Sequence, residues 1–198
     1  MPNDTDYLRF IDQTLLSDNW GKLTRYRFEY LRSDGSWQEQ IREAYDRGNG
    51  VTCLLHNPDT DCVLLTRQFR LPVLLNGKDP FLIEAPAGLL EGANPEERMR
   101  SELVEETGYE VSELEHLFDV HMSPGSVAEY LSFYKGTYHL NDKVSEGGGE
   151  ESEGEDIEVL HVPLTEALAM IRSGEISDAK TILLLQELAL RQLIAQSG

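Results

Sequence analysis

Alternating polar and apolar residues predict a β-hairpin near the N-terminus. Aromatic residues at every second position from Tyr26 to Tyr30 are separated by charged residues, and Asp34-Gly35 supplies a turn before the chain returns over residues 37–45. A two-stranded ribbon is marginally stable alone, so it needs a surface to pack on. We therefore expect residues 1–45 to form a small β appendage.

Apolar runs of strand length and two amphipathic stretches follow along the chain. We predict strands at residues 51–56, 62–70, 81–84, 114–122, 130–138 and 157–162, and helices at 165–172 and 179–196. The mixed order of these elements indicates a sheet sandwiched between helices. The sequence therefore predicts an α/β domain over residues 46–198, preceded by the β-hairpin appendage.

A further helix, rich in glutamate, is predicted from Asn94 to Gly108. The Asn94 side chain can cap its first turn, with Pro95 at the first helical position and Glu97 completing a capping box. Gly108 supplies the left-handed residue that commonly ends a helix. These signals indicate about thirteen helical residues directly after the Pro86-Ala87-Gly88 loop.

Glu102, Glu105 and Glu106 lie on one side of this helix, because they are three and four residues apart. Like charges on neighbouring turns repel one another, so a positive partner is expected. Carboxylate oxygens suit Mg²⁺ or Mn²⁺, and these ions also accept substrate phosphates as ligands. The alternative is a solvated acidic helix face. The Pro-Ala-Gly loop ahead of the helix favours the metal site.

The charge balance limits the partners of the chain. Its 198 residues include 17 Lys and Arg against 36 Asp and Glu, a formal net charge of −19 at pH 7. This charge opposes binding to nucleic acids and to anionic membranes, whereas a bound cation and a few arginines can still admit a small phosphate ester. The first six residues have no signal pattern and no apolar run reaches membrane-spanning length. We therefore expect a cytoplasmic protein.

The glutamate-rich segment resembles the Nudix box, the signature of the Nudix hydrolase superfamily. The matching residues are Gly88, Glu102, Leu103, Glu105, Glu106, Gly108 and Tyr109. The chain departs from the pattern because the interval from Gly88 to Glu102 is one residue shorter, Asn94 replaces a glutamate, and Ser101 replaces an arginine. Arg98 or Arg100 could take over from the missing arginine, since Arg98 lies one helical turn before Glu102.

Four further segments resemble the nucleoside-diphosphate-sugar branch of this superfamily, in order and spacing, at residues 45–50, 66–70, 122–125 and 155–159. The resemblance covers almost the whole chain and implies a Nudix-type α/β/α sandwich with a mixed sheet. It also implies a homodimer in which the appendage completes the substrate site of the partner subunit. A lid on its own subunit is the alternative for the appendage.

The resemblance implies a metal site on Glu102, Glu105 and Glu106, with the backbone carbonyl of Ala87 as a further ligand. It also implies that the loop of residues 143–156 brings a base to the metal. The composition of this loop, six acidic residues and four glycines, fits either a mobile cover or a disordered acidic insertion.

Within this loop, Glu153 matches the position of the base in the family. Glu155 is then a nearby metal contact or a substitute base, and Glu151 is a further alternative for the base.

Five residues are expected to bind substrate. Arg67 and Arg70 lie on a predicted strand, where guanidinium groups suit phosphate oxygens, although strand arginines also form surface ion pairs. By resemblance, Arg70 is the better candidate, Arg42 and Glu43 meet the nucleoside, and Glu129 lies near substrate and metals.

The sequence thus predicts a Mg²⁺-dependent enzyme that hydrolyses the diphosphate bond of a nucleoside diphosphate sugar. The members that it resembles most act on GDP-mannose and release GMP and mannose 1-phosphate, and those next in resemblance act on ADP-ribose or other ADP-sugars. An alternative of another class is a catalytically silent Nudix-fold sensor of nucleotides. Asn94 and Ser101 favour the sensor, and the intact set of three glutamates opposes it.

Overall fold

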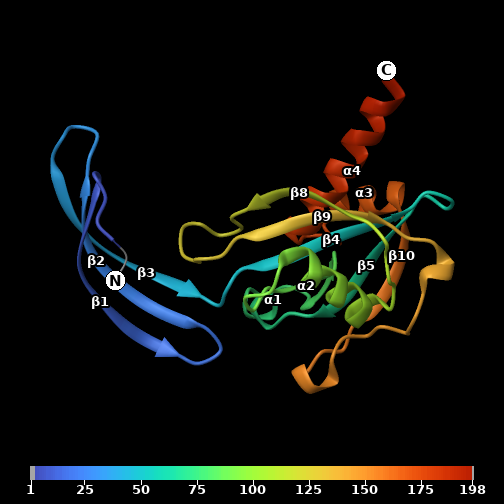
Figure 1. Cartoon of the computed structure of the whole chain (residues 1–198), viewed down its shortest axis with the longest axis horizontal. Coiled ribbons are helices and arrows are strands. Elements are labelled where there is room, and N and C mark those ends of the chain that lie inside the picture. The colour runs from blue at the N-terminus through green and yellow to red at the C-terminus, as the bar shows by residue number, and fades with distance from the viewer. Residues whose placement is uncertain (1–2, 198) are drawn as a thin grey trace. The chain divides into compact units, whose positions relative to one another are not determined.

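A computed structural model of the chain describes residues 3–197, except for the side chain of Glu153. These residues separate into two compact units. The first runs to Asn49 and also contains His121–Tyr130, and the second consists of Gly50–Val120 and the chain from Leu131 onward. Figure 1 shows the elements of both units, and each unit is described by itself.

The first unit is an antiparallel sheet with the strand order β1-β2-β3, formed by β1 (Leu8–Asp18), β2 (Lys22–Leu31) and β3 (Trp37–Asp46). The predicted hairpin is present as β2 and β3. Strand β1 was not predicted, because shifts in its pairing with β2 between Phe10 and Asp12 and between Leu15 and Ser17 interrupt the alternation of its side chains. The appendage therefore has one strand more than the sequence suggested.

The segment His121–Tyr130 belongs to this first unit although it lies far along the chain. The backbone amide of Tyr45 donates to Ser126 O over 2.9 Å, and Ala128 N donates to Tyr45 O over 2.8 Å. Tyr130 N donates to the side chain of Asn49 over 3.1 Å. These bonds tie the segment to the end of β3.

The second unit contains a mixed sheet with the strand order β10-β5-β4-β9-β8, in which β6 also pairs with β5 and β7 with β4. Strands β4 and β9 are parallel and the other pairs are antiparallel. The strands are β4 (Gly50–Asn57), β5 (Cys62–Phe69), β6 (Phe81–Glu84), β7 (Ala87–Leu89), β8 (Leu114–Val120), β9 (Leu131–Thr137) and β10 (Glu158–Pro163).

The helices of this unit are α1 (Leu71–Leu75), α2 (Pro95–Glu102), α3 (Leu164–Ser173) and α4 (Ala179–Ser197), with a π-helical turn η1 (Leu103–Thr107) and 3₁₀ turns η2 (Leu140–Asp142) and η3 (Glu151–Glu153). The predicted helices at 165–172 and 179–196 are confirmed as α3 and α4. Helix α1 and strand β7 were not predicted. Among the described residues, none of the helices is both long and apolar enough to span a bilayer.

Strand β4 explains why the sheet has helices on both faces. Nearly every residue from Gly50 to Asn57 is buried, so neither face of this strand is left to solvent. Val51 and Cys53 belong to a core cluster with Met99 of α2, whereas Leu54, which points the other way, lines a cavity together with Leu184 of α4. The arrangement is the α/β/α sandwich that the resemblance implied.

Candidate functional site

The glutamate-rich helix begins as the sequence predicts. The Asn94 side chain accepts hydrogen bonds from Glu96 N (3.0 Å) and Glu97 N (3.3 Å), and Gly108 ends the helix with φ +79°. The continuous α-helix expected up to Gly108 is wrong in detail, because the turn Leu103–Thr107 is π-helical. Such wide turns are frequent at functional sites, and this one carries Glu105 and Glu106.

Glu106 is the most deeply buried of the three carboxylates, with 1% of the residue exposed. Its Oε2 accepts a hydrogen bond of 3.1 Å from the backbone amide of Ala87. The peptide before that amide is also fixed, because Pro86 O accepts bonds from Cys53 N (3.1 Å) and the Thr52 hydroxyl (3.0 Å). The Pro86-Ala87 loop is therefore tied to both the sheet and the glutamate-rich helix.

Glu102 and Glu105 share one arginine. Arg98 places Nη2 at 2.6 Å from Glu102 Oε1 and Nη1 at 3.3 Å from Glu105 Oε2, and its Nε donates to Leu89 O over 3.1 Å. Arg100 instead pairs with Glu96 and donates to the backbone carbonyl of Val111. Of the two arginines considered from the sequence, Arg98 is the one that orients the carboxylates.

Gly88 gives the Glu102 carboxylate its space. A Cβ atom at position 88 would overlap the Oε1 and Cδ atoms of Glu102. Only glycine therefore allows this carboxylate, 5% exposed, to lie directly against β7. This contact is the physical reason for a glycine at the start of the box.

The carboxylates repel one another electrostatically. Burial raises the pKa of Glu106 well above its ordinary value, and the charges of Glu102 and Glu155 raise it further, against a lowering by the Ala87 hydrogen bond. A cation near these groups would favour their ionised forms, and their oxygens are the donors that Mg²⁺ and Mn²⁺ prefer. The residues present thus fit a divalent ion in donor type and charge.

The carboxylates are nevertheless not gathered around one point. Among the described residues, no group of three or more His, Cys, Asp and Glu side chains could hold a metal ion as placed. Arg98 holds Glu102 and Glu105, whereas Glu106 faces the Ala87 amide. A shared ion would therefore need the side chains to move, with Arg98 as the common partner that sets the positions of Glu102 and Glu105.

A buried ion-pair cluster adjoins the Pro86-Ala87 loop, and the sequence did not single it out. Glu84 binds Arg70 Nε over 2.7 Å and Lys180 Nζ over 2.5 Å, and Lys180 also lies 3.1 Å from Asp178. The Thr181 hydroxyl accepts from the next backbone amide, that of Ala85, over 2.7 Å. The cluster joins Arg70 to the start of α4.

Two charged residues at positions where the sequence pattern is apolar could have indicated this ion-pair cluster. Glu84 ends an otherwise apolar strand, and Lys180 lies four residues before Leu184 on the buried face of α4. A charged residue at a core position usually has an oppositely charged partner.

The other predicted substrate residues lie in different surroundings. Arg67 forms an exposed pair of 3.4 Å with Glu158 and stacks 5.0 Å from the centre of the Phe81 ring. Arg42 and Glu43 are on β3 in the first unit, where Arg42 donates to Ile41 O. Glu129 is in the 121–130 segment of that same unit. The roles of these residues stay predictions.

The acidic loop carries two main candidates for the base, Glu155 and Glu153, and of these two the structure describes the side chain of Glu155 alone. The Glu155 carboxylate accepts a hydrogen bond of 3.0 Å from Glu150 N, and its charge acts on Glu106. Glu153 lies in η3, but its side chain is outside the described part of the structure. The choice between these two glutamates therefore stays a prediction.

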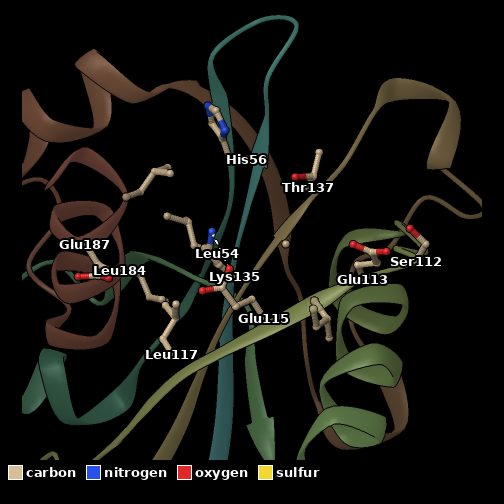
Figure 2. A pocket seen from close by; sticks show the side chains of 13 residues that line it. Leu54, His56, Ser112, Glu113, Glu115, Leu117, Lys135, Thr137, Leu184 and Glu187 are labelled. Carbon is tan, nitrogen blue, oxygen red and sulfur yellow. Dashed lines mark ion pairs between the residues drawn. The ribbon is translucent and has the colours of Figure 1, made fainter. Parts of the chain in front are cut away.

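A cavity of about 280 Å³ lies on the other face of β4 from α2. Figure 2 shows Leu54 and Leu184 on its walls, with His56, Lys135 and Glu115 around them. None of the described residues that line it is a predicted site residue. This cavity is therefore not the site that the carboxylates form.

Two family models match the chain consecutively. The model of the NUDIX domain matches residues 46–187, and the model described as the GDP-mannose pyrophosphatase NudK N-terminal domain matches residues 8–45. The chain belongs to the Nudix family. It is a Nudix hydrolase, and the glutamate-rich helix belongs to the segment from Gly88 to Tyr109 that matches the Nudix box.

Three similar proteins align with this Nudix hydrolase over most of the chain and over most of their own lengths. A protein of Pectobacterium atrosepticum named GDP-mannose pyrophosphatase is 48% identical over 94% of the chain and 96% of its own length. Proteins of the same name from Yersinia enterocolitica and Escherichia coli O157:H7 are 49% and 46% identical, over 89% and 96% of the chain and 92% and 99% of their own lengths.

A solved structure described as an ADP compounds hydrolase has the same fold. It superposes with a TM-score of 0.74 at 15% identity and covers 100% of this chain and 99% of its own.

Proposed function

We propose that this Nudix hydrolase cleaves GDP-mannose into GMP and mannose 1-phosphate in the presence of Mg²⁺. The observation that carries the proposal is the match of two family models, one for the Nudix domain and one for the N-terminal domain of GDP-mannose pyrophosphatase. Relatives with that name at 46–49% identity support it. The three box glutamates that are present, Glu102, Glu105 and Glu106, would supply the metal ligands.

The proposed metal site consists of Glu102, Glu105, Glu106 and the backbone carbonyl of Ala87. Bound Mg²⁺, or Mn²⁺ in its place, would neutralise charge on the diphosphate oxygens as the phosphoanhydride breaks. Glu106 is held in place by the Ala87 amide, and Arg98 orients the other two carboxylates. This preorganisation limits the motion needed to gather the ligands.

Hydrolysis requires a base for the attacking water. We assign this role to Glu153, with Glu155 as a nearby metal contact or substitute. The base removes a proton as the water oxygen bonds to one phosphorus, and the bond from that phosphorus to the bridging oxygen breaks, so that each product carries one phosphate. Comparison of Glu153→Gln with Glu155→Gln identifies the base by the larger loss of kcat.

Arg70 is proposed to bind the diphosphate, with Arg67 in support. The pair with buried Glu84 fixes the Nε edge of the partly exposed Arg70 guanidinium and leaves its other nitrogens for phosphate oxygens. Arg42 and Glu43 are proposed to meet the nucleoside, and Glu129 to lie near substrate and metals.

The substrate is tested with a panel of GDP- and ADP-sugars in the presence of Mg²⁺. GDP-mannose is expected to give the highest kcat/KM. A preference for ADP-ribose over GDP-mannose by about tenfold, or 1.4 kcal/mol in transition-state binding, would overturn the choice of substrate. Absence of turnover with any diphosphate substrate would instead support a nucleotide sensor.

We further propose a cytoplasmic homodimer, with residues 1–45 as an appendage that serves dimerisation and the substrate site, and residues 46–198 as the Nudix domain. The three-stranded sheet carries exposed Ile11, Leu15, Leu16 and Ile41, which a second subunit could cover. Light scattering on the purified protein tests the dimer. A monomeric mass at all accessible concentrations would contradict it.

A further inference from the structure

Three consecutive glycines connect the acidic loop to the end of the Nudix-box helix. Gly148 N donates to Glu106 O over 2.9 Å, and Gly149 N donates to Glu105 O over 3.0 Å. The last carbonyls of a helix have no partners within it, so these bonds satisfy groups that would otherwise need water. We call Gly147–Gly149 the glycine strap.

The same segment continues to the strand that follows the loop. Gly148 O accepts a bond of 3.1 Å from Ile157 N, so one glycine links the Nudix-box helix to the residue before β10. On its other side, Gly108 O accepts from Val144 N and Ser145 N over 2.8 and 3.2 Å. The loop expected to be mobile from its composition is therefore fastened by backbone bonds at both of its ends.

The close approach of the strap depends on the absence of side chains. All three residues have positive φ, +70°, +109° and +81° in order. A Cβ atom on Gly147 would lie 2.5 Å from the carbonyl carbon of Thr107 and 2.6 Å from Glu106 O. Because those neighbours are backbone atoms of the helix end, an alanine here would push the loop away from the helix.

The strap also sets where Glu155 lies. A Cβ atom on Gly149 would lie 2.7 Å from the Glu155 Cβ and 2.6 Å from its Oε2. The loop folds back on itself there, since Glu155 N donates to Glu150 O over 3.3 Å and the Glu155 carboxylate accepts from Glu150 N. The side chain of Glu155 is thus packed on the strap.

We propose that the glycine strap is a positioning device that holds the acidic loop, and with it Glu155, against the end of the Nudix-box helix at Glu105 and Glu106. It acts through the position of this loop and not by contact with substrate. Its catalytic consequence rests on the proposed function, but the anchoring itself does not. The two parts can therefore be tested separately.

Hydrogen exchange tests the anchoring without any substrate. In the wild type, the amides of Gly148 and Gly149 are expected to be protected, and in Gly147→Ala exchange over residues 143–157 should accelerate about tenfold or more. Gly154→Ala is the matched control, because Gly154 has φ +78° in the same loop but, among the described residues beyond its chain neighbours, no atom within 4 Å of its Cβ position. Unchanged protection in Gly147→Ala, or equal losses in both variants, would overturn the proposal.

Turnover of GDP-mannose tests the consequence. Gly147→Ala should lower kcat and raise the Mg²⁺ concentration for half-maximal activity, each about tenfold or more, with a smaller change in KM. Gly174→Ala, at φ +87° with open space around it at the end of α3, should leave all three values near wild type. A wild-type Mg²⁺ requirement in a Gly147→Ala protein with accelerated exchange would refute positioning.

Two outcomes need a second measurement: a Gly147→Ala protein that does not fold, and a wild type that shows no turnover. If Gly147→Ala does not fold, Gly149→Ala replaces it, because its new Cβ meets the Glu155 and Ile157 side chains rather than the helix backbone. If the wild type hydrolyses no nucleotide sugar, the proposed function fails, whereas the exchange data still decide whether the strap anchors the loop.

Discussion

Lys180 and Glu84 form an ion pair that is almost completely removed from water, with 7% and 3% of the residues exposed and 2.5 Å between Nζ and Oε1. Burial alone would lower the pKa of Lys180, but the charges of Glu84 and Asp178 outweigh burial and raise it. The two carboxylates therefore favour the charged form of Lys180, and its contact with Glu84 joins α4 to the strand before the Pro86-Ala87 loop.

Removal of this lysine should destabilise the fold. In Lys180→Met, Glu84 keeps Arg70 but loses its second cation, and Asp178 loses a partner as well, so we expect a loss of about 3 kcal/mol in unfolding free energy. Urea denaturation measures it. Lys78→Met, at an exposed position, is the control and should change stability by less than about 0.5 kcal/mol. Equal stability of the two variants would show that the pair contributes nothing.

Arg98 and Arg100 lie two residues apart on α2 and should respond differently to truncation. Arg98→Ala removes the partner that orients Glu102 and Glu105, and we expect the Mg²⁺ concentration for half-maximal activity to rise about tenfold. Arg100→Ala removes contacts with Glu96 and Val111 and should affect stability alone. Titration of activity with Mg²⁺ measures both. The interpretation fails if Arg100→Ala shifts the Mg²⁺ requirement more than Arg98→Ala does.

Glu106→Gln should abolish turnover while nucleotide binding persists. The amide keeps the size of the side chain but removes the negative charge that a divalent ion requires, so kcat should fall about 100-fold or more. Steady-state kinetics and calorimetry with the product nucleotide measure the two effects. Glu97→Gln, at an exposed position on the same helix, serves as control. Retained activity in Glu106→Gln would exclude this carboxylate from the proposed metal site.

The raised pKa of Glu106 predicts how stability depends on pH without a metal. The Glu106 carboxyl binds a proton more tightly in the folded protein than in the unfolded chain, so its protonation adds to the free energy of unfolding. This stabilisation is fully present below the ordinary glutamate pKa of 4.5 and is lost as the pH rises through the pKa of the folded state. Relative to Glu106→Gln, the wild type should therefore lose stability as the pH rises in the presence of a chelator.

Denaturation of both proteins at several pH values measures this difference. Added Mg²⁺ should reduce the loss, because a cation stabilises the ionised carboxylate. A difference between the two proteins that does not vary with pH would contradict the predicted linkage.

Local signals were sufficient to predict the start and end of the glutamate-rich helix. Asn94 and Gly108 act through bonds to residues nearby in sequence, so their roles could be inferred without a structure. The π-helical turn was not predicted, since its wide geometry accompanies bonds from Gly148 and Gly149, about forty residues further on. For the same reason, the bonds that attach the acidic loop to the helix end could not be predicted from the sequence.

Contacts between segments far apart in the chain could not be predicted from the sequence either. Lys180 and Glu84 are 96 positions apart, and only the packing of α4 on the sheet brings them together. Arg98 was one of two candidates for the missing box arginine, and side-chain geometry was needed to decide between them. Strand β1 was not predicted, because its register shifts interrupt the alternation of polar and apolar residues that indicates a strand.

The bonds between β3 and the 121–130 segment have a consequence for protein engineering. Tyr45 exchanges two backbone hydrogen bonds with residues 126 and 128, and Asn49 binds Tyr130, so the N-terminal sheet is completed by a piece of chain inserted between β8 and β9. A chimera that transplants this sheet from one relative to another would have to carry both segments. Exchange of residues 1–49 alone would combine parts of one folded unit that come from different proteins.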